Sequence, residues 1–406
     1  METIVFLGSQ KSGTSRDAIR TAAEMGYFNV LFTNKKKHLR EREAFSEVHE
    51  MIYIEELLDK DTIVKELNIL NTKGKDVKAV VSFIDPFVSL AAELTGFFGL
   101  VTLSVEALYT MEDKWRFREK LKGNEATPFF SVCSLEEAQV DMIKYHKLLP
   151  LVIKSPKSSG SKDVLHVETE QDLNKAIRYF QRRKLNSHVI IEEYLKGPQY
   201  LVEVVVNHSE ISVVAIIDQE VSSFNRFIIT GYEYPTQLSF QSQAKLIDAV
   251  KSIVCDLGLQ HGTCHLELRL VNGQWKLIEI NPRMAGGAMN QLILEATGIN
   301  LVKETIKLYL GKEPSLLPTY NKHVFAQFVT VDATGRLLKV TGKTKASKFD
   351  CIKEVYIKPH KGSILTPPLS MGNRYAFVLA SSEVPNQAKE MAKLAAKEIR
   401  FYLEPL

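Results

Sequence analysis

Two acidic side chains and an amide stand on neighbouring strand-like segments in the second half of the chain. Glu267 and Glu279 lie twelve residues apart, on either side of an Asn272-Gly273 pair that is typical of a tight hairpin turn. Asn281 follows Glu279 by two positions, so both side chains point to one face of their strand. Carboxylate and amide oxygens are the hard ligands that Mg²⁺ prefers. We therefore predict a metal site at Glu267, Glu279 and Asn281, with two acids on a solvated sheet face as the alternative.

An arginine and a histidine extend this polar alternation. Arg283 follows Asn281 by two residues, and a guanidinium there can pair with a phosphoryl group or a carboxylate. His265 precedes Glu267 by two positions and is placed to orient a substrate. A hydrogen-bonded structural histidine is the equal alternative for His265.

A lysine at the end of a short apolar strand begins a second candidate site. Lys154 ends the run Leu151–Lys154 and is followed by small and polar residues, among them Ser161. The ammonium group neutralises phosphate charge, and N–H groups of such a loop donate to phosphate oxygens. The loop can also close over a bound triphosphate. The segment predicts a phosphate-binding loop, with an ordinary hairpin loop as the alternative.

Two further segments carry weaker signals. From Val189 to Tyr200, a strand-like run, a Gly-Pro turn and a second strand-like run expose backbone groups that can read a nucleobase; a plain strand–turn–strand is the alternative. The loop from Gly8 to Ser15 lacks the Walker pattern, because Thr14 stands where that motif requires lysine. We predict a tight turn into a helix, whose N-terminus can still hold an anion such as a carboxylate.

Alternating strands and helices position these residues in the first part of the chain. Short apolar runs predict strands, and apolar residues at helical spacing predict helices between them. This alternation is typical of a parallel sheet with helices on its faces. The predicted strands are Thr3–Leu7, Phe28–Phe32, Ala79–Phe83 and Leu100–Leu103, and the predicted helices are Ser15–Met25 and Phe87–Leu94.

The rest of the chain is predicted to be mixed α+β, then an antiparallel meander with helices on one side. The helices expected are Asp172–Arg182, Ser242–Leu257 and Leu292–Leu310. Residues from about 320 should form a smaller α+β unit ending in a helix over Pro385–Tyr402. The predicted strands are Val152–Lys154, Val189–Glu192, Leu201–Asn207, Ile211–Asp218, His265–Leu270 and Trp275–Ile280.

Taken together and in this order, the candidate segments resemble the ATP-grasp superfamily over about residues 1–310. The resemblance implies an α/β and α+β multidomain protein with an ATP-grasp fold. Its parts would be a Rossmann-like pre-ATP-grasp domain at 1–112, ATP-grasp subdomains at 113–188 and 189–318, and a small C-terminal α+β domain at 319–406. The run Asn281-Pro-Arg-Met-Ala-Gly-Gly287 looks like that of bacterial L-amino acid ligases, the dipeptide synthetases related to bacilysin synthetase.

The resemblance also implies roles for single residues. The backbones of Glu192 and Leu195 would read adenine, and Gln199 stands where the family often has a ribose-binding Glu, a departure at which an amide can still hydrogen-bond. The implied nucleotide-binding residues are Lys114, Lys154, Ser161, Glu192, Glu193, Leu195 and Gln199; the metal ligands are Glu267, Glu279 and Asn281. The implied catalytic residues are Arg283 and Gly286, and the substrate candidates are Pro86, Arg226, His265, Met284 and Gly287.

The substrate candidates have alternatives of their own. Pro86, Phe87 and Met284 can line an apolar side-chain pocket, with a plain turn and helix start as the alternative for Pro86 and Phe87. Arg226 can clamp a carboxylate, with a surface loop as the even alternative.

The implied activity is ATP-dependent joining of two L-amino acids into a dipeptide through an acyl phosphate, with release of ADP and phosphate. ATP and Mg²⁺ are the implied cofactors, with Mn²⁺ as an alternative ion. We expect an apolar N-terminal and a small C-terminal residue in the product. A biotin-carboxylase-like carboxylase and a non-catalytic ATP-binding module are the competing interpretations.

The composition limits the classes of binding partner and the cellular location that the sequence supports. The 406 residues carry 52 basic and 48 acidic side chains, a net charge of +4 that is too balanced to indicate a nucleic-acid or membrane partner. Four cysteines without CxxC spacing favour reduced thiols over a disulfide framework. A secretory signal has a basic segment followed by a long apolar run, and the first residues show neither. The chain is therefore expected to be cytoplasmic. Small-molecule amino acids are the expected partners, and a homodimer is a family-based expectation.

Overall fold

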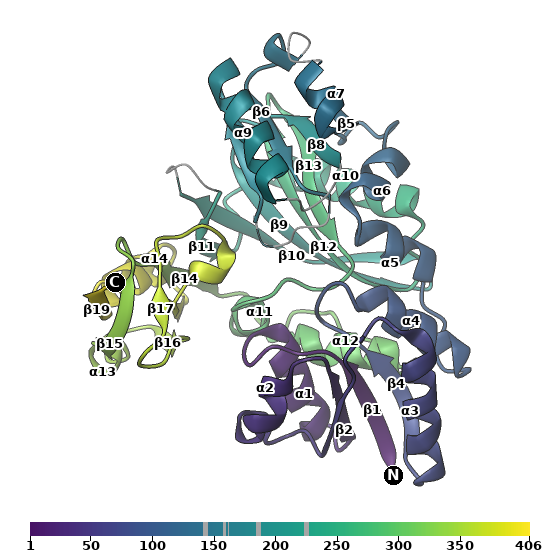
Figure 1. Ribbon diagram of the computed structural model, residues 1–406. Coiled ribbons are helices and arrows are strands. Elements are labelled where there is room, and N and C mark those ends of the chain that lie inside the picture. The colour runs from purple at the N-terminus through teal and green to yellow at the C-terminus, as the bar shows by residue number, and fades with distance from the viewer. Residues whose placement is uncertain (141–144, 157–159, 161, 184–187, 223–226) are drawn as a thin grey trace.

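The computed structural model of the protein describes residues 1–140, 145–156, 160, 162–183, 188–222 and 227–406. Within these residues the strands form four sheets. Figure 1 shows a purple N-terminal unit below, teal and green central sheets above it, and a yellow C-terminal unit beside them. Ser161 and Arg226 lie outside the described residues.

The N-terminal unit is a parallel sheet in the order β3-β2-β1-β4. Helices cover both faces, so Ile4 and Phe6 enter one apolar cluster while Val5 and Leu7 enter another. Its strands are β1 (Glu2–Leu7), β2 (Phe28–Thr33), β3 (Glu50–Tyr53) and β4 (Asp76–Val81). Its helices are α1 (Thr14–Glu24), α2 (Lys36–Arg40), η1 (Arg42–Phe45), α3 (Lys60–Thr72), α4 (Val88–Phe97) and α5 (Val105–Met111).

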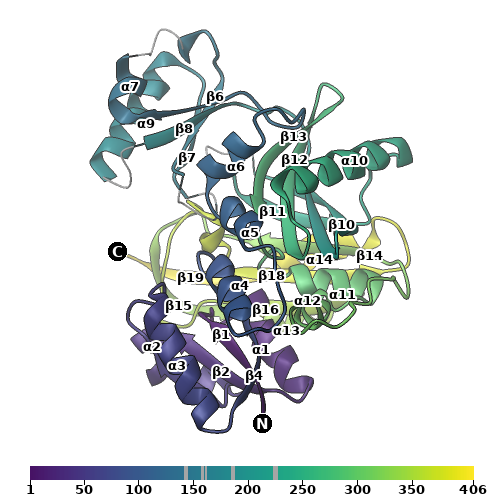
Figure 2. The same cartoon turned by 90° about the vertical axis from the view of Figure 1, so that its right-hand side faces the viewer.

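The smaller central sheet is antiparallel, in the order β5-β8-β6-β7. It comprises β5 (Phe130–Ser134), β6 (Leu151–Lys154), β7 (Val164–Val167) and β8 (His188–Glu193), preceded by α6 (Lys114–Lys120) and joined by α7 (Leu135–Val140) and α9 (Glu170–Arg183). Leu173, Ile177 and Phe180 recur at helical spacing in α9 and bury one side of the sheet. Figure 2 shows this unit standing away from the others.

The large sheet runs β13-β12-β9-β10-β11-β14-β18-β16 and spans the central and C-terminal units. Asn272 and Gly273 have positive φ in the turn between β12 and β13, as the Asn-Gly pair predicts. Helix α10 packs Val250, Ile253 and Val254 against the apolar face of this sheet. The central elements are β9 (Gln199–Asn207), β10 (Glu210–Val221), β11 (Ile229–Tyr234), α10 (Phe240–Leu257), β12 (Gly262–Val271), β13 (Gln274–Asn281), α11 (Met289–Thr297) and α12 (Leu301–Tyr309).

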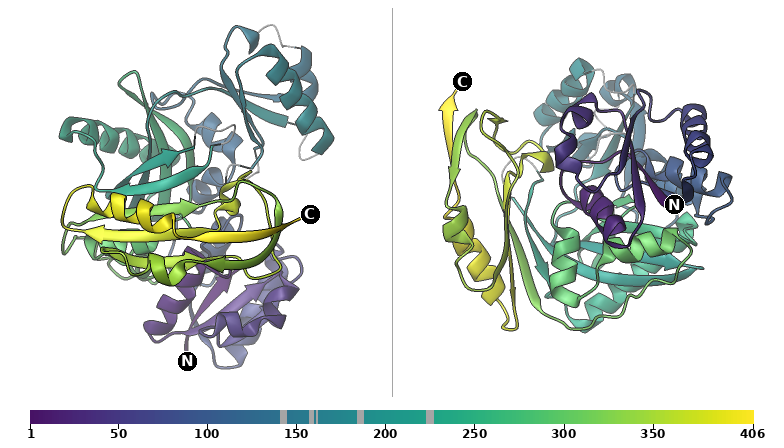
Figure 3. Two further views of the ribbon diagram at one scale, coloured as in Figure 1. Left: turned by 90° about the vertical axis from the view of Figure 1, so that its left-hand side faces the viewer. Right: turned by 90° about the horizontal axis from the view of Figure 1, so that it is seen from below.

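The C-terminal unit contributes three strands to the large sheet and has a sheet of its own, β17-β15-β19. Figure 3 shows these strands lying across the molecule beside the N-terminal unit. Helix α14 packs its alanines on Phe325 and Val378. The elements are β14 (His323–Val329), β15 (Gly335–Thr341), α13 (Lys343–Ala346), β16 (Ile352–Ile357), β17 (Ile364–Leu365), η2 (Met371–Asn373), β18 (Ala376–Ser382), α14 (Gln387–Ala396) and β19 (Arg400–Pro405).

Several predicted elements differ from the structure. Residues 100–103 pair with no described strand, and the fourth parallel strand is the half-buried β3 instead. Gly298, at φ +81°, ends α11 in the left-handed region and splits the single helix predicted over residues 292–310. Helix α14 ends at Ala396, and Phe401 and Leu403 alternate onto an apolar cluster as part of β19.

The unit boundaries at 112, 188 and 318 stay predictions. Strand β8 pairs with β5 and β6, and β14 pairs with β11, so residues on both sides of the two later boundaries share a sheet. None of the described helices is both long and apolar enough to cross a membrane.

Candidate active site

One face of the large sheet carries polar side chains in rows across β9, β12 and β13. In β12, His265 and Glu267 alternate with Leu266 and Leu268, which are buried in the main apolar cluster. Residues opposite one another in antiparallel strands share a face. The two rows are Leu201, Glu267 and Glu279, then Glu203, His265 and Asn281.

The predicted metal ligands Glu267 and Glu279 are cross-strand neighbours. Burial, together with the Glu279 charge, raises the pKa of Glu267 to about 7. Burial acts in the same direction on Glu279, but Lys114 outweighs it and holds the pKa of Glu279 below its usual value. Lys114 Nζ lies 2.7 Å from Glu279 Oε1, and Gln199 Nε2 donates to Glu267 Oε2 at 3.1 Å. Among the described residues, Lys114 is therefore the one cation that forms an ion pair with either of these two half-buried carboxyl groups.

The predicted ligand Asn281 is oriented by His265. Burial lowers the pKa of His265 to about 4, so the imidazole is neutral near pH 7. Its Nδ1 lies 2.7 Å from the Arg283 carbonyl oxygen, which can only accept, so Nδ1 carries the proton. Nε2 must then accept from Asn281 Nδ2 at 3.2 Å. This assignment keeps the Asn281 carbonyl oxygen out of the bond to His265.

These oxygens fit a hard divalent cation. Two carboxyl groups and an amide oxygen lie on one face, and burial, followed by the Glu279 charge, raises the pKa of Glu267, so a cation beside both carboxyl groups would stabilise their charged forms. Among the described residues, no three His, Cys, Asp or Glu side chains gather as a metal site. A cation here would therefore depend on the amide and on oxygens of a bound substrate.

A bulge at Ile278 joins the metal row to a buried ion-pair cluster. Glu279 lies opposite Glu267 while Leu277 lies opposite Leu268, so Ile278 has no partner in β12. The Ile278 carbonyl oxygen instead accepts from Arg118 Nη2 at 2.8 Å and from Lys154 Nζ at 3.4 Å. The bulge also interrupts the alternation of the two strand faces in β13. Leu277 and Ile280 are three positions apart and are nevertheless both buried.

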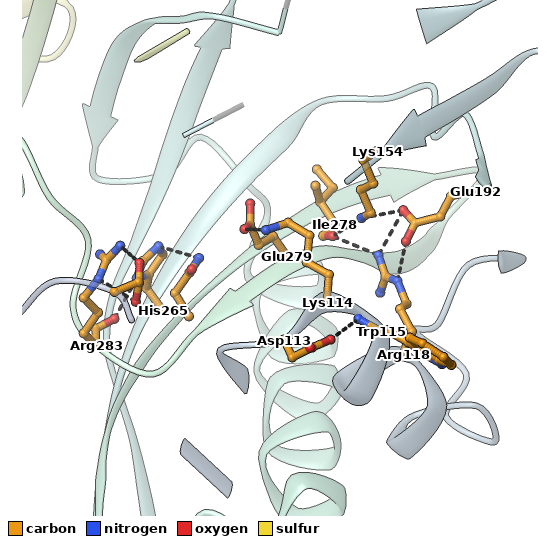
Figure 4. A network of polar contacts seen from close by, with 12 residues as sticks. Asp113, Lys114, Trp115, Arg118, Lys154, Glu192, His265, Ile278, Glu279 and Arg283 are labelled. Atoms are coloured by element: carbon orange, nitrogen blue, oxygen red, sulfur yellow. Dashed lines mark hydrogen bonds and ion pairs between the residues drawn. The ribbon is translucent and has the colours of Figure 1, made fainter. Parts of the chain in front are cut away.

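Glu192 lies between two cations in that cluster. Arg118 Nε donates to Glu192 Oε1 at 2.6 Å, and Lys154 Nζ lies 2.8 Å from Oε2. Burial lowers the pKa of Lys154 to about 8, with Glu192 opposing the shift. Figure 4 shows Lys114 and Glu279 between this cluster on one side and His265 with Arg283 on the other. The side chain of Glu192 thus has a structural task besides the backbone role predicted for it.

Arg118 was missed by reasoning from the sequence. A signal was present, because Lys114 and Arg118 are four residues apart and share one face of α6, which Asp113 caps by accepting from Trp115 and Arg116 N–H groups. This spacing does not reveal the partner of Arg118, because Glu192 lies 74 residues further along the chain.

The predicted nucleotide-binding residues surround one pocket. Its apolar wall includes Val152, Val164, Phe227, Ile278 and, from the C-terminal unit, Met371. Its polar lining includes Lys114, Lys154, Glu192, Glu193, Leu195, Gln199, Glu267 and Glu279. Arg269, also unpredicted, donates to the Leu195 carbonyl and, at 3.0 Å, to Gln199 Oε1. An apolar slot with polar groups at one end suits a planar base followed by phosphates.

The loop after β13 lies where the N-terminal unit meets the large sheet. Arg283 forms two hydrogen bonds with Asp85, at the end of the β4 segment. Ala285 N donates to Glu203 Oε1 at 2.8 Å, and its carbonyl accepts from Thr14 Oγ1 at 2.8 Å. Gly286 and Gly287 are exposed, and a Cβ on Gly13 would lie 3.3 Å from Gly287 N.

The predicted substrate residues are only partly brought together. Pro86 lines a small pocket with Gly8 and Ile84 at the carboxyl edge of the parallel sheet. Met284 is 1% exposed and belongs to the main apolar cluster, so its side chain lies in different surroundings from Pro86. Ser161 and Arg226 are outside the described residues, and Gly160 and Phe227 are their nearest described neighbours in sequence.

Two protein-family models match the chain. The first is described as ATP-grasp domain and covers residues 147–291; the second is described as L-amino acid ligase C-terminal domain 2 and covers residues 327–404. The chain contains an ATP-grasp domain. Its first 146 residues lie outside both matches, so the parallel sheet is described from the structure alone.

Individual relatives of this ATP-grasp-domain protein are distant. The crystal structure of L-amino acid ligase from Bacillus licheniformis superposes with a TM-score of 0.83 at 18% identity, over 99% of this chain and 98% of that chain. An uncharacterized protein of Sinorhizobium fredii is 23% identical, over 85% of this chain and 72% of the relative. Carnosine synthase 1 of Mus musculus is 24% identical, over 64% of this chain and 34% of that protein. The chain thus spans about a third of carnosine synthase 1, and the superposition shows the fold.

Proposed function

We propose that this ATP-grasp-domain protein is an ATP-dependent carboxylate–amine ligase that joins two L-amino acids through an acyl phosphate. The observation that carries the proposal is the convergence of Lys114, Lys154, Glu267 and Glu279 on one pocket. The match to an L-amino acid ligase C-terminal domain and the likeness to a solved L-amino acid ligase support this choice among ligases.

The reaction consists of two displacements. A carboxylate oxygen of the first amino acid attacks the γ-phosphorus of ATP, and the bond to the ADP oxygen breaks. The amine nitrogen of the second amino acid then attacks the acyl carbon, the bond to phosphate breaks, and the amine gives up a proton. Both steps collect negative charge on oxygen atoms, so cations and alignment contribute most of the catalysis.

The chain offers positive charge from several sides. Lys114 and Lys154 would neutralise phosphate oxygens, while Glu267, Glu279 and Asn281 would hold the metal ion. Mg²⁺ or Mn²⁺ bound there supplies further positive charge to phosphate oxygens.

The loop after β13 would hold the reacting carbonyl. We assign the backbone N–H of the exposed Gly286 to the developing oxyanion. Asp85 fixes the Arg283 guanidinium by two hydrogen bonds, so that Arg283 would meet its ligand in one preset orientation.

The first amino acid would be apolar. Ile84, Pro86 and Phe87 supply the apolar part of the small pocket at the carboxyl edge of the parallel sheet, and an apolar side chain would pack there. The rest of the lining is Gly8 and six polar or charged residues, Ser9, Gln10, Thr33, Asn34, Lys35 and Asp85. Ligands of open α/β sheets bind at this edge. The homodimer and the cytoplasmic location stay predictions.

The test is ADP release by the Glu279→Gln variant with pairs of amino acids. Removing one of the two carboxylates should lower amino-acid-dependent ADP release by about a hundredfold or more. The metal ion would lose an anionic ligand, and the phosphates would then lose the positive charge of the metal ion. Glu210→Gln, an exposed residue of the same sheet, is the matched control and should keep full activity.

Two results would contradict the proposal. Full activity of Glu279→Gln would refute the metal assignment. Wild-type ADP release that requires bicarbonate in place of an amino acid would refute the amino acid ligase.

A further inference from the structure

A wide cleft separates the N-terminal unit from the C-terminal unit and ends at the loop after β13. One wall is formed by residues 10–13 and 35–38, and the opposite wall by segments around β16, β17 and η2. Gly287 and Gly160 belong to its lining, and Met371 lines both this cleft and the nucleotide pocket. A molecule in the cleft would therefore reach the loop where we place the acyl phosphate.

The lining of this cleft is strongly basic. As far as the structure describes the lining, it contains five lysines, one arginine and no aspartate or glutamate. Glu41, behind the wall, pairs with Lys11 and Lys37. Lys35 and Lys358 donate only to neutral oxygens, Lys35 to Gln10 Oε1 at 3.0 Å and Lys358 to the Gly372 carbonyl at 2.7 Å. Two facing walls thus each present a cation that no described carboxylate neutralises.

Among the described cations that line this cleft, Arg374 is the one seen beside the reaction loop. Its guanidinium lies 3.8 Å from the centre of the Phe328 ring, and its Nη2 lies 3.6 Å from the position of a Cβ on Gly287. Its Nη1 is buried and has no hydrogen-bond partner among the described residues. A buried guanidinium N–H without an acceptor is unfavourable, so this atom favours an anionic ligand.

We propose that this cleft binds the amine substrate, and that this substrate carries an anionic side chain, a carboxylate or a phosphate, which Lys358 and Arg374 recognise. The proposal rests on the ligase function above and replaces the small second residue expected from the sequence. The nucleotide does not account for the cleft, because the residues assigned to ATP line the other pocket. An amino acid with a neutral side chain would leave Arg374 Nη1 without an acceptor among the described residues and would leave the Lys358 charge without a counter-ion, while Glu267 is the described carboxylate that interacts with the Arg374 charge.

The test compares matched acceptors with leucine as the fixed first substrate. Glutamate against glutamine, aspartate against asparagine, and O-phosphoserine against serine each change one anionic group. We expect the anionic member to have the higher kcat/KM by about tenfold, the scale of a partly buried charge-assisted contact. The better of glutamate and O-phosphoserine identifies the carboxylate or the phosphate as the natural group.

Two variants and a control locate the effect in the cleft. Lys358→Met and Arg374→Met should each reduce the glutamate-over-glutamine ratio severalfold, mainly through KM for glutamate. Lys361→Met removes the same charge from an exposed residue of the connection between β16 and β17 that does not line the cleft, and should keep the ratio. Lys358 donates only to one backbone carbonyl, so its variant remains informative if Arg374→Met fails to fold.

The outcomes separate the two proposals. Equal kcat/KM for glutamate and glutamine, or an unchanged ratio in Lys358→Met, would overturn the anionic substrate while leaving the ligase intact. No ADP release with any pair would contradict the ligase itself. Calorimetric titration of glutamate and glutamine into the wild-type protein then decides on the cleft alone: tighter binding of glutamate supports it, and equal or absent binding overturns it.

Discussion

Arg118 is fully buried, and every hydrogen bond described for it leads to the candidate site. It donates to both oxygens of Glu192, at 2.6 and 3.2 Å, and to the carbonyls of Leu277 and Ile278. The same residue thereby fixes the carboxylate beside Lys154 and the bulged backbone beside the metal row. A buried charge with this many partners stabilises the fold only while all of them remain.

Arg118→Met should therefore destabilise the protein by about 3–5 kcal/mol, because Glu192 would stay buried with one cation fewer. The measurement is chemical unfolding followed by circular dichroism. Arg116→Met, which removes an exposed guanidinium from the same helix, is the matched control. Equal losses of stability in the two variants would show that the buried Arg118 guanidinium contributes no more to the free energy of unfolding than the exposed Arg116 guanidinium.

Glu203 gives a pH-dependent prediction. Burial raises the pKa of Glu203 from 4.5 to about 8, and its one described hydrogen bond is from Ala285 N. A carboxyl group with a raised folded-state pKa contributes its stability below pH 4.5 and loses it as the pH rises to 8. In Glu203→Gln the amide oxygen can still accept from Ala285 N. Because an amide does not titrate, the variant should not show this pH-dependent loss of stability.

The expected result is a melting temperature that falls less between pH 5 and pH 8 in Glu203→Gln than in the wild type. The difference in unfolding free energy should be on the order of a few kcal/mol. Glu210→Gln should follow the wild-type profile. Parallel profiles for all three proteins would mean that Glu203 does not titrate in this range.

Which site residues the sequence could predict depends on how far away their partners are. Glu267, Glu279 and Asn281 were found because a hairpin joins them and strand alternation fixes their face. Arg118 and Arg374 have partners far along the chain, which no local pattern reveals. Their partners are Glu192 for the first, and Phe328 and Gly287 for the second.

At the scale of elements, the ladder positions of β12 and β13 followed from the sequence, but the bulge did not. Alternation alone would bury Ile278 with Ile280, whereas the structure buries Leu277 and leaves Ile278 lining the nucleotide pocket. The helix–strand difference at residues 400–405 has a different cause, since Phe401 and Leu403 have the strand period but form a run too short to separate from the helical pattern that precedes it. The conformation of a short apolar run, and which of its residues are buried, depends on the residues it packs against in the fold.

The turn between β8 and β9 offers a prediction about an element. A methyl group on Gly197 would lie 2.0 Å from the Leu270 carbonyl oxygen, so the turn must shift. Gly197→Ala should raise KM for ATP by roughly tenfold and cost about 1–3 kcal/mol, because Leu195 and Gln199 on either side lose their bonds to Arg269. Steady-state kinetics and thermal unfolding measure both effects.

Gly123→Ala is the control for that experiment, because a Cβ on Gly123 would meet no atom within 4 Å. An unchanged KM for ATP in Gly197→Ala would contradict the role given to the segment around Leu195.

At the scale of the molecule, the C-terminal unit is built into the large sheet. Strand β14 pairs with β11 from the Gly231–Gln327 pair to the Tyr234–Val324 pair. The Phe325 ring lies where Gly231 would carry a side chain, 2.5 Å from that position. The two units therefore share backbone hydrogen bonds and a tight contact.

Deletion of residues 319–406 should leave a protein that aggregates, because β11 would become an exposed strand edge and the main apolar cluster would lose its cover by Val324, Ala326, Phe328 and Leu379. Soluble yield and size-exclusion chromatography measure this. Deletion of residues 400–406 removes only β19, which pairs with β15 at the rim, and should leave a soluble protein. A monomeric, soluble 1–318 fragment would contradict the dependence of the large sheet on β14.

The hydrogen bond from Thr14 to Ala285 has a consequence for how this protein is made. A ribosome releases β1 and α1 well before the loop after β13, and Ala285, the partner of Thr14, lies 271 positions further along the chain. The main apolar cluster likewise extends from Ile4 to Leu379. Contacts of such long range form slowly. Until the large sheet has been translated, the growing polypeptide must therefore keep one face of the N-terminal unit, which carries Ile4, Phe6 and Ile19, from associating with other molecules.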